Sequence, residues 1–331
     1  MRFLQRNRKI IASVITVVLI TWVLSGIDME ALREMKKNIS ALWLTLGAAV
    51  YFLTYAWRTF RVKAFLPSAL SFKTLAILTG IHNMAVRILP NPAGEFVFMN
   101  QMKGRNIPYP DSLAVVIVNR TLDFIIVACF LTAGLVFTLG AAGKAGLWWT
   151  LISFTVIVFG VGVLFILSTR PSLALFLGSK ILRLIPVGAF RNKAETFLTK
   201  VVNAFGQFKE CRVYERAILY SVLLWGTMFL AYGFFMKGFG FNIPPLAIVV
   251  GGAVQIFTNT IPNIAGLGVM EAGWVAGLLL SGIGKETAVL ASLSVDISTL
   301  LGTLLFGGIS FLLDRSASML DGTPFISKEN P

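Results

Sequence analysis

The sequence predicts an all-α protein that crosses a membrane several times. Of its 331 residues, 56% are apolar and only 13% are charged, whereas a soluble domain of this size is about one quarter charged. Several apolar runs approach the roughly 20 residues that a helix needs to cross a bilayer. Two of these runs contain Pro, Asn and Gly near the middle, and such residues break helices. A bilayer tolerates broken backbone only beside protein or water, so the two breaks mark candidate functional positions.

Six apolar stretches are predicted to cross the membrane completely. They lie at about 10–27, 41–57, 112–139, 147–168, 217–236 and 287–313. The basic residues before residue 10 resemble the start of a signal peptide, but no cleavage site of small residues follows the apolar run. The first stretch is therefore predicted to remain as a span, with the N-terminus in the cytoplasm.

The two interrupted regions, about 72–103 and 245–283, are predicted to be re-entrant helical hairpins. In the first region the limb Glu95–Met102 is too short to cross, and basic residues flank both ends of the region. A hairpin that enters and leaves through the cytoplasmic face fits this pattern better than two crossings. Three crossings then separate the hairpins, so the second is predicted to enter from the opposite face. Two ordinary kinked spans are the alternative.

Basic residues mark the segments predicted to be cytoplasmic. The stretch 169–216 holds nine Lys or Arg against three Glu, and the positive-inside rule assigns such a stretch to the cytoplasm. The same rule assigns the end of the second span, with Arg58, Arg61 and Lys63, and both termini to that side of the plasma (inner) membrane. The chain is thus predicted to be one integral membrane domain, 1–331. An inverted-topology repeat is expected within it, with its halves at about 41–139 and 217–313.

The two breaks resemble each other in sequence. The first reads Leu89-Pro90-Asn91-Pro92-Ala93-Gly94-Glu95, and the second reads Ile261-Pro262-Asn263-Ile264-Ala265-Gly266, followed by Gly268 and Glu271. A helix that starts at such a break presents N–H donors and partial positive charge, which suit phosphate or carboxylate. Glu95 and Glu271 fall in the first turns of these helices, where each can cap the helix or pair with a cation of the protein or of a substrate. The predicted hinge residues are Pro90, Gly94, Pro262, Gly266 and Gly268.

Charged residues inside the apolar spans are further candidates. Arg120 and Asp123 lie three residues apart on one helix face, beside Asn119. A charge at the bilayer centre costs at least about 2.5–3.5 kcal/mol, so this pair must face protein or water. Two interpretations are open. Arg120 can bind a phosphate that Asp123 helps to orient, since a planar guanidinium suits phosphate, or the charges are structural and join the helix to the first hairpin through Glu95.

Asp296 is the counterpart of Arg120 in the second half of the chain. Each lies 25 residues after its glutamate, and no Lys or Arg lies within ten residues of Asp296. Its partner must therefore come from elsewhere, and Arg87, one turn before the first break, is the predicted one. The predicted substrate-binding residues are the charged and amide side chains around both breaks: Arg87, Asn91, Glu95, Asn119, Arg120, Asp123, Asn263, Glu271 and Asp296.

Other kinds of chemistry find little support in the sequence. The net charge is +14, but the basic residues lie between apolar spans, which is typical of membrane topology rather than of nucleic-acid binding. The single histidine, His82, and the two cysteines form no metal-binding pattern, and no nucleotide-binding motif is present. No metal, cofactor or catalytic residue is therefore predicted. The pairs Trp57-Arg58 and Trp148-Trp149 are interpreted as interfacial anchors.

Taken together, these motifs resemble the transmembrane region of the lysylphosphatidylglycerol synthase family, also described as flippase-like domain proteins. The family's second break usually reads Leu-Pro-x-x-Pro-Gly-Gly-Leu-Gly, so Ile261, Ala265 and Leu267 depart from it. The resemblance implies a membrane domain that moves or gathers lipid, sometimes fused to a soluble transferase domain. A stand-alone membrane domain is expected here. The matching elements are Trp57-Arg58, Leu89-Pro90-x-x-Ala93-Gly94-Glu95, Asn119-Arg120-x-x-Asp123 and Ile261-Pro262-x-x-Ala265-Gly266-x-Gly268-Val269-x-Glu271.

We therefore expect a flippase-like lipid translocase that acts on membrane lipids. Its substrate is expected to be a charged-headgroup lipid, namely a phospholipid, an aminoacylated lipid or a polyprenyl-linked glycolipid. The headgroup would cross through a polar cavity between the hairpins. A non-catalytic accessory subunit that presents lipid to a separate synthase or glycosyltransferase is the alternative. A membrane-embedded transferase is a third possibility, but no nucleophile or donor-binding loop is evident.

Overall fold

A computed structural model of the chain describes residues 38–66, 70–89, 92–182, 188–208, 211–259 and 268–320. Every regular element in these ranges is a helix, and the ranges contain no strand, which confirms the all-α class. The predicted span at 10–27 lies outside the described residues, and so do Pro90, Asn91, Pro262, Asn263 and Gly266.

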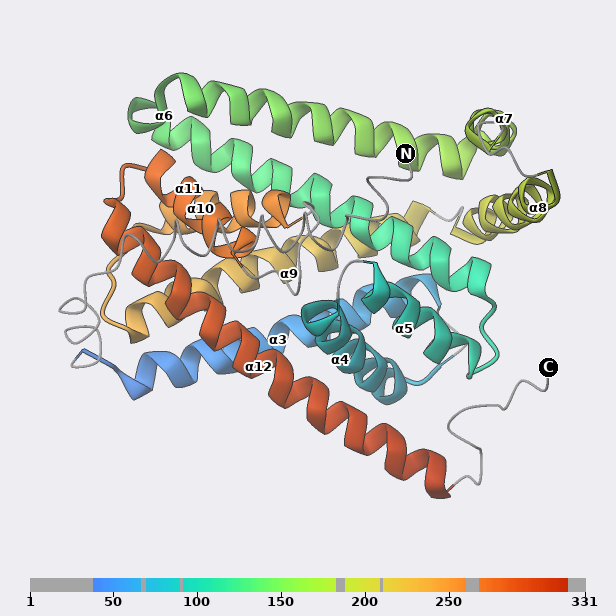
Figure 1. Cartoon of the computed structure of the whole chain (residues 1–331), viewed down its shortest axis with the longest axis horizontal. Helices are drawn as coiled ribbons and strands as arrows, with labels where there is room; N and C mark the ends of the chain where they lie inside the picture. The colour runs from blue at the N-terminus through green and yellow to red at the C-terminus, as the bar shows by residue number, and fades with distance from the viewer. Residues whose placement is uncertain are drawn as a thin grey trace.

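Four apolar stretches of the described chain are long enough to cross a membrane, and they coincide with four of the six predicted spans: Tyr109–Phe137, Gly146–Thr169, Arg212–Gly238 and Lys285–Ser316. The first two belong to α6 (Tyr109–Thr169), the third to α9 (Cys211–Gly238) and the fourth to α12 (Lys285–Leu320). Figure 1 shows the two stretches of α6 as legs that run side by side. Gly160 of the second leg packs closely against Ile125 of the first.

Helix α3 (Ala41–Phe65) contains the predicted span at 41–57 but continues about two turns beyond it. The apolar character of the sequence falls at Trp57-Arg58, which is why the span was expected to end there. The helix continues because its later residues pack against other helices, among them α9, which lies along α3 (Figure 1). The buried residues after Arg58 are Thr59, Arg61, Val62 and Phe65.

Each of the two interrupted regions forms a pair of packed helices. Helix α4 (Phe72–Ile88) packs on α5 (Ala93–Lys103), and α10 (Pro245–Thr258) packs on α11 (Val269–Leu280). The four helices are 17, 11, 14 and 12 residues long, shorter than the roughly 20 residues of a typical span. Each interrupted region therefore contains two helices that pack on each other and are too short to be typical spans.

Glycine residues determine the backbone geometry beside the breaks. A Cβ atom at Gly94 would lie 2.6 Å from the backbone of Val86, so only glycine lets α5 start this close to α4. Gly268 precedes α11 with a φ of 77°, in the left-handed region that favours glycine. Two of the predicted hinge residues thus stand where a side chain would be strained or would collide.

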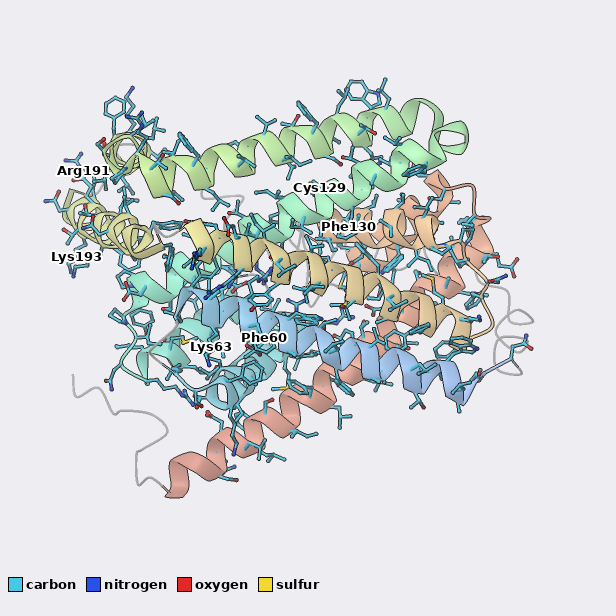
Figure 2. The ribbon with its side chains drawn as sticks, turned by 180° about the vertical axis from the view of Figure 1, so that it is seen from behind. Phe60, Lys63, Cys129, Phe130, Arg191 and Lys193 are labelled. Atoms are coloured by element: carbon cyan, nitrogen blue, oxygen red, sulfur yellow. The ribbon has the colours of Figure 1, made fainter. Side chains whose placement is uncertain are left out.

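The segment predicted to be a basic cytoplasmic loop, 169–216, contains two further helices, α7 (Pro171–Leu182) and α8 (Gly188–Phe205). Figure 2 shows the basic residues Arg191 and Lys193 of α8 at one end of the molecule. The C-terminal part of α8 packs into the protein through Val201, Val202, Ala204 and Phe205, which are all buried.

Two hydrophobic clusters hold the helices together. One is centred on α9, α10 and α11 and includes Trp274, whereas the other joins the end of α3 to α4, α5 and the start of α6 and includes Leu75. On α3 the first cluster ends at Tyr55 and the second begins at Val62. The polar side chains of the candidate site lie at this boundary.

Candidate functional site: a polar chamber between two hairpins

A cavity of about 420 Å³ lies at the boundary of the two hydrophobic clusters. We call it the polar chamber, because polar side chains from α3, α4, α5, the first leg of α6, α10 and α12 line its walls. Its volume falls within the range of about 300–1,000 Å³ that is usual for ligand sites. The charged and hydrogen-bonding residues that line it include Thr54, Arg58, Asn83, Arg87, Glu95, Arg120, Asp123, Gln255, Thr299 and Thr303.

A smaller compartment of about 40 Å³ adjoins the polar chamber. Arg58, Glu95 and Arg120 line both spaces, whereas Arg61 and Asn119 line only the smaller one. The Oδ1 atom of Asn119 is buried and accepts no hydrogen bond from the described residues. Asn119 therefore lies beside the chamber, with an acceptor that a bound molecule or a water can use.

Glu95 links three helices through its carboxylate. Its Oε1 atom accepts a hydrogen bond of 2.8 Å from Arg120 Nε and a second one from Nη2 of the same residue. Its Oε2 atom lies 2.8 Å from His82 Nε2. Both oxygens are thus used by side chains, and α5 has no side-chain N-cap. Of the interpretations left open by the sequence, the structure contains the ion pair between Arg120 and Glu95. The Arg120 side chain nevertheless remains 39% exposed.

Asp123 accepts three hydrogen bonds from two other helices. Arg61 donates to its two oxygens from Nη1 and Nη2, over 2.5 and 3.2 Å, and Trp225 donates from Nε1 over 2.9 Å. The side chains of Arg61 and Asp123 are only 4% and 7% exposed. Asp123 is therefore occupied by Arg61 and Trp225 rather than by Arg120, and it joins α3, α6 and α9.

Arg58 and Arg61 are the charged residues of the site that sequence reasoning missed. The sequence places them at the cytoplasmic end of a span. In the structure α3 continues as a helix, so that Arg58 lines the polar chamber and Arg61 lines the smaller compartment. Two sequence signals point to them. They are three residues apart and so share a helix face, and the acid Asp123, inside an apolar span, requires a cation from another element.

The predicted pair between Arg87 and Asp296 is present. Arg87 Nη2 donates to Asp296 Oδ1, and Nη1 of the same guanidinium contacts the sulfur of Met270. The pair joins the first hairpin to α12 and to the start of α11. Glu271 lies close enough to Asp296 for the two carboxyl groups to interact. It is 6% exposed, and its Oε2 atom has no hydrogen-bond partner in the described chain.

We expect Arg87→Asp to lower the thermal stability of the detergent-solubilised protein substantially, because it leaves a buried acid without its cation and adds a second carboxylate. Breaking a buried pair costs about 3–5 kcal/mol. The exchanged variant Arg87→Asp/Asp296→Arg should recover much of this loss. Arg105→Asp is the matched control, because Arg105 pairs with Asp314, which lies on α12 like Asp296. The Arg105 side chain is more exposed than that of Arg87, 25% against 13%. Its cost should be smaller. An exchanged variant as unstable as Arg87→Asp would show that the pair is not formed.

Among the described residues, Arg58 is the arginine of the polar chamber without an ion-pair partner. Three other arginines of the site each pair with a carboxylate: Arg61, Arg87 and Arg120. Arg58 lines both the polar chamber and the smaller compartment, yet within the described chain no hydrogen bond or ion pair engages its guanidinium. A half-buried cation of this kind attracts an anion.

Nothing in the described ranges suggests a metal centre. They contain no group of three His, Cys, Asp or Glu side chains that could hold an ion. The imidazole of His82 faces Glu95.

The helices and the chamber define a multi-helix membrane protein with a charged cavity beside two broken helical hairpins. The chain belongs to the family described as the lysylphosphatidylglycerol synthase TM region, whose model matches residues 9–307. The family links this membrane domain to the handling of lipids. No curated protein matches the chain.

Proposed function

We propose that this protein is a flippase-like translocase that moves a charged-headgroup lipid between the leaflets of the plasma (inner) membrane. The observation that carries the proposal is Arg58, whose guanidinium forms no ion pair with any described residue, in a chamber whose other arginines are paired. An uncompensated cation in a membrane domain is costly. A phosphate in the chamber would offset this cost, because a planar guanidinium binds phosphate through two parallel hydrogen bonds.

The remaining charged residues have distinct roles in this proposal. Arg58 binds the lipid phosphate, and the partly exposed Arg120 contacts it while remaining paired with Glu95. Arg87 and Asp296 hold the first hairpin on α12. Glu271, which lies near Asp296 and has one oxygen without a partner among the described residues, accepts the amine of headgroups that carry one. Asn91, Asn119 and Asn263 supply neutral hydrogen bonds.

Alternating access follows from the proposed topology. We propose that the two hairpins enter from opposite faces as halves of an inverted repeat, with both termini cytoplasmic. Arg87–Asp296 and Arg105–Asp314 both connect the first hairpin region with α12. A rocking motion of the halves would have to break or exchange these ion pairs. In this proposal the pairs therefore stabilise one of the two states, inward-open or outward-open.

Cysteine labelling tests this topology. Gly104 and Gly284 are both exposed, and a Cβ atom fits at each: the nearest atom is 3.6 Å away at Gly104, and none lies within 4 Å at Gly284. In a background without the native cysteines, we expect Gly104→Cys to react with a membrane-impermeant maleimide only from the cytoplasmic side. Gly284→Cys should react only from the outside. Reaction of both from one side would contradict the inverted repeat.

The alternative function is a non-catalytic subunit that presents lipid to a separate synthase or glycosyltransferase. The description of the family supports this alternative, because it names the membrane region of a synthase. In that case the polar chamber would hold a headgroup at one membrane face without passing it to the other. A membrane-embedded transferase is the third reading.

Reconstitution in liposomes separates these functions. Fluorescent phosphatidylglycerol, phosphatidylethanolamine, lysyl-phosphatidylglycerol and a polyprenyl-phosphate sugar would each be followed by quenching with a membrane-impermeant reductant. We expect the wild-type protein to accelerate leaflet exchange of at least one of these lipids over protein-free liposomes. Lipid binding without exchange would favour the accessory function, and formation of a new lipid product from soluble donors would favour the transferase.

A further inference from the structure

A second cavity, almost entirely apolar, lies between the two legs of α6 and α10. It has a volume of about 390 Å³, similar to that of the polar chamber. Its walls include Phe124 of the first leg, Val156, Phe159 and Val163 of the second leg, and Phe257 of α10. We call it the apolar groove.

The apolar groove offers almost nothing to a polar ligand. Its two hydroxyl groups belong to Thr121 and Thr155, and each donates to a carbonyl of its own helix: Thr121 to Ile117 over 2.8 Å and Thr155 to Leu151 over 2.9 Å. Among the described residues, no charged side chain lines it. A ligand that gains free energy here must do so by burying hydrocarbon.

The groove adjoins the polar chamber. Phe124 lines both spaces, and its ring stacks on that of Phe257, with 6.1 Å between the centroids. Thr121 of the groove directly follows Arg120 of the chamber in sequence. One amphiphilic molecule can therefore place a charged group in the chamber and a hydrocarbon chain in the groove, with Phe124 between them.

The second leg of α6 has the features of a helix that faces lipid. In the most apolar 18-residue stretch of Gly146–Thr169, only 11% is buried inside the protein. The corresponding share in Tyr109–Phe137 is 44%. Phe159, which lines the groove, is 72% exposed. A chain in the groove can thus come from the surrounding membrane without crossing a polar surface.

We propose that the apolar groove binds one hydrocarbon chain of the lipid whose phosphate lies in the polar chamber. This inference rests on the proposed function, because it takes the lipid headgroup to be the occupant of the chamber. The chain is either an unbranched fatty acyl chain or an isoprenoid chain with a methyl group on every fourth carbon, since both are slender hydrocarbons without a hydrogen-bonding group. The groove then holds the tail while the headgroup is bound.

Photo-crosslinking with chain-labelled lipids tests the proposal. The probes are phosphatidylglycerol with a diazirine near the middle of one acyl chain, and a polyprenyl phosphate with a diazirine in its chain, each added to the purified protein in lipid nanodiscs. We expect crosslinks to concentrate on groove residues such as Val156 and Val163. The arm that labels more strongly identifies the kind of chain. Arg58→Ala should reduce labelling in the groove at least about fivefold, because the headgroup no longer anchors the lipid.

A matched pair of substitutions tests the same site without changing its charge. Val156→Trp fills the groove, whereas Val158→Trp lies on the same helix at a position that is 56% exposed and outside the groove. Val156→Trp should remove most of the groove labelling, and Val158→Trp should leave it unchanged. Equal labelling of the groove and of residue 158 by both probes would show ordinary membrane contact and overturn the proposal. Capture of another protein segment by a crosslinker at residue 163 would overturn it as well.

The labelling experiment does not depend on transport. If leaflet exchange is absent but labelling depends on Arg58 and Val156, the groove is a chain-binding site in a protein that presents lipid rather than moving it. If exchange occurs but the groove is not labelled, the chain travels elsewhere and only this inference fails.

Discussion

Replacing Arg58 by alanine is expected to reduce the initial rate of lipid leaflet exchange by about tenfold or more. A hydrogen bond to a charged group contributes about 1.5–3 kcal/mol, and each 1.4 kcal/mol corresponds to roughly a factor of ten. Arg58 lines the polar chamber and the smaller compartment, and it forms no ion pair in the described part of the chain. Its removal should therefore cost binding of the phosphate more than it costs the fold. The rate would be measured in liposomes that contain equal amounts of protein.

Two control variants separate the loss of the planar guanidinium from the loss of a positive charge on α3. Arg58→Lys keeps the charge but not the planar pair of donors, so its rate should fall between those of the wild type and Arg58→Ala. Lys63→Ala removes a cation from the same helix that lines neither cavity, and its rate should equal that of the wild type. The thermal unfolding temperatures of all three should be similar. Exchange that is equally fast with Arg58→Ala would remove Arg58 from the proposed site.

Arg61→Met is expected to have the largest effect on stability. It leaves Asp123 buried among three helices with Trp225 as its only remaining hydrogen-bond donor among the described residues, and breaking a buried ion pair costs about 3–5 kcal/mol. The double variant Arg61→Met/Asp123→Asn removes both charges and keeps an acceptor for Trp225. It should therefore be more stable than Arg61→Met alone. Thermal unfolding in detergent, followed by size-exclusion chromatography, measures the difference.

The two arginines of α3 thus separate structure from function. Arg61 pairs with Asp123 through both Nη atoms and should control stability, whereas Arg58 forms no hydrogen bond or ion pair within the described chain and should control transport. A double variant no more stable than Arg61→Met would mean that the pair with Asp123 contributes little. Loss of folding with Arg58→Ala would mean that Arg58 has a structural role like that of its neighbour.

Much of the fold could be predicted from the sequence because burial in a membrane has a simple signature. The apolar stretches of α6, α9 and α12 coincide with predicted spans, and the Pro and Gly residues of both breaks correctly divided the two interrupted regions into helices. The length of α3 was missed for a physical reason. Its last two turns carry Arg58 and Arg61, which lower the apolarity of the sequence, while their burial against other helices is visible only in three dimensions.

The candidate site was predictable where a charge lacked a local partner. Asp296 has no cation nearby on its own span, and the search for one led to Arg87, which the structure pairs with it. Arg120 had two nearby acids in the prediction, Asp123 on its own helix and Glu95 in the hairpin, and spacing alone does not choose between them. The structure pairs Arg120 with Glu95 because Arg61 occupies Asp123.

The claim at the centre of this account is that one chamber is reached from both sides of the membrane in turn. Thr299→Cys, in a background of Cys129→Ala and Cys211→Ser, tests it directly. Thr299 lines the polar chamber, and its hydroxyl bonds only to carbonyls of its own helix, so a thiol fits there with little disturbance. We predict that a membrane-impermeant thiol reagent labels this cysteine from either side in sealed vesicles, and that a phosphate-bearing lipid slows both reactions. Labelling from one side alone, under every condition, would contradict translocation and leave a pocket that holds lipid at a single membrane face.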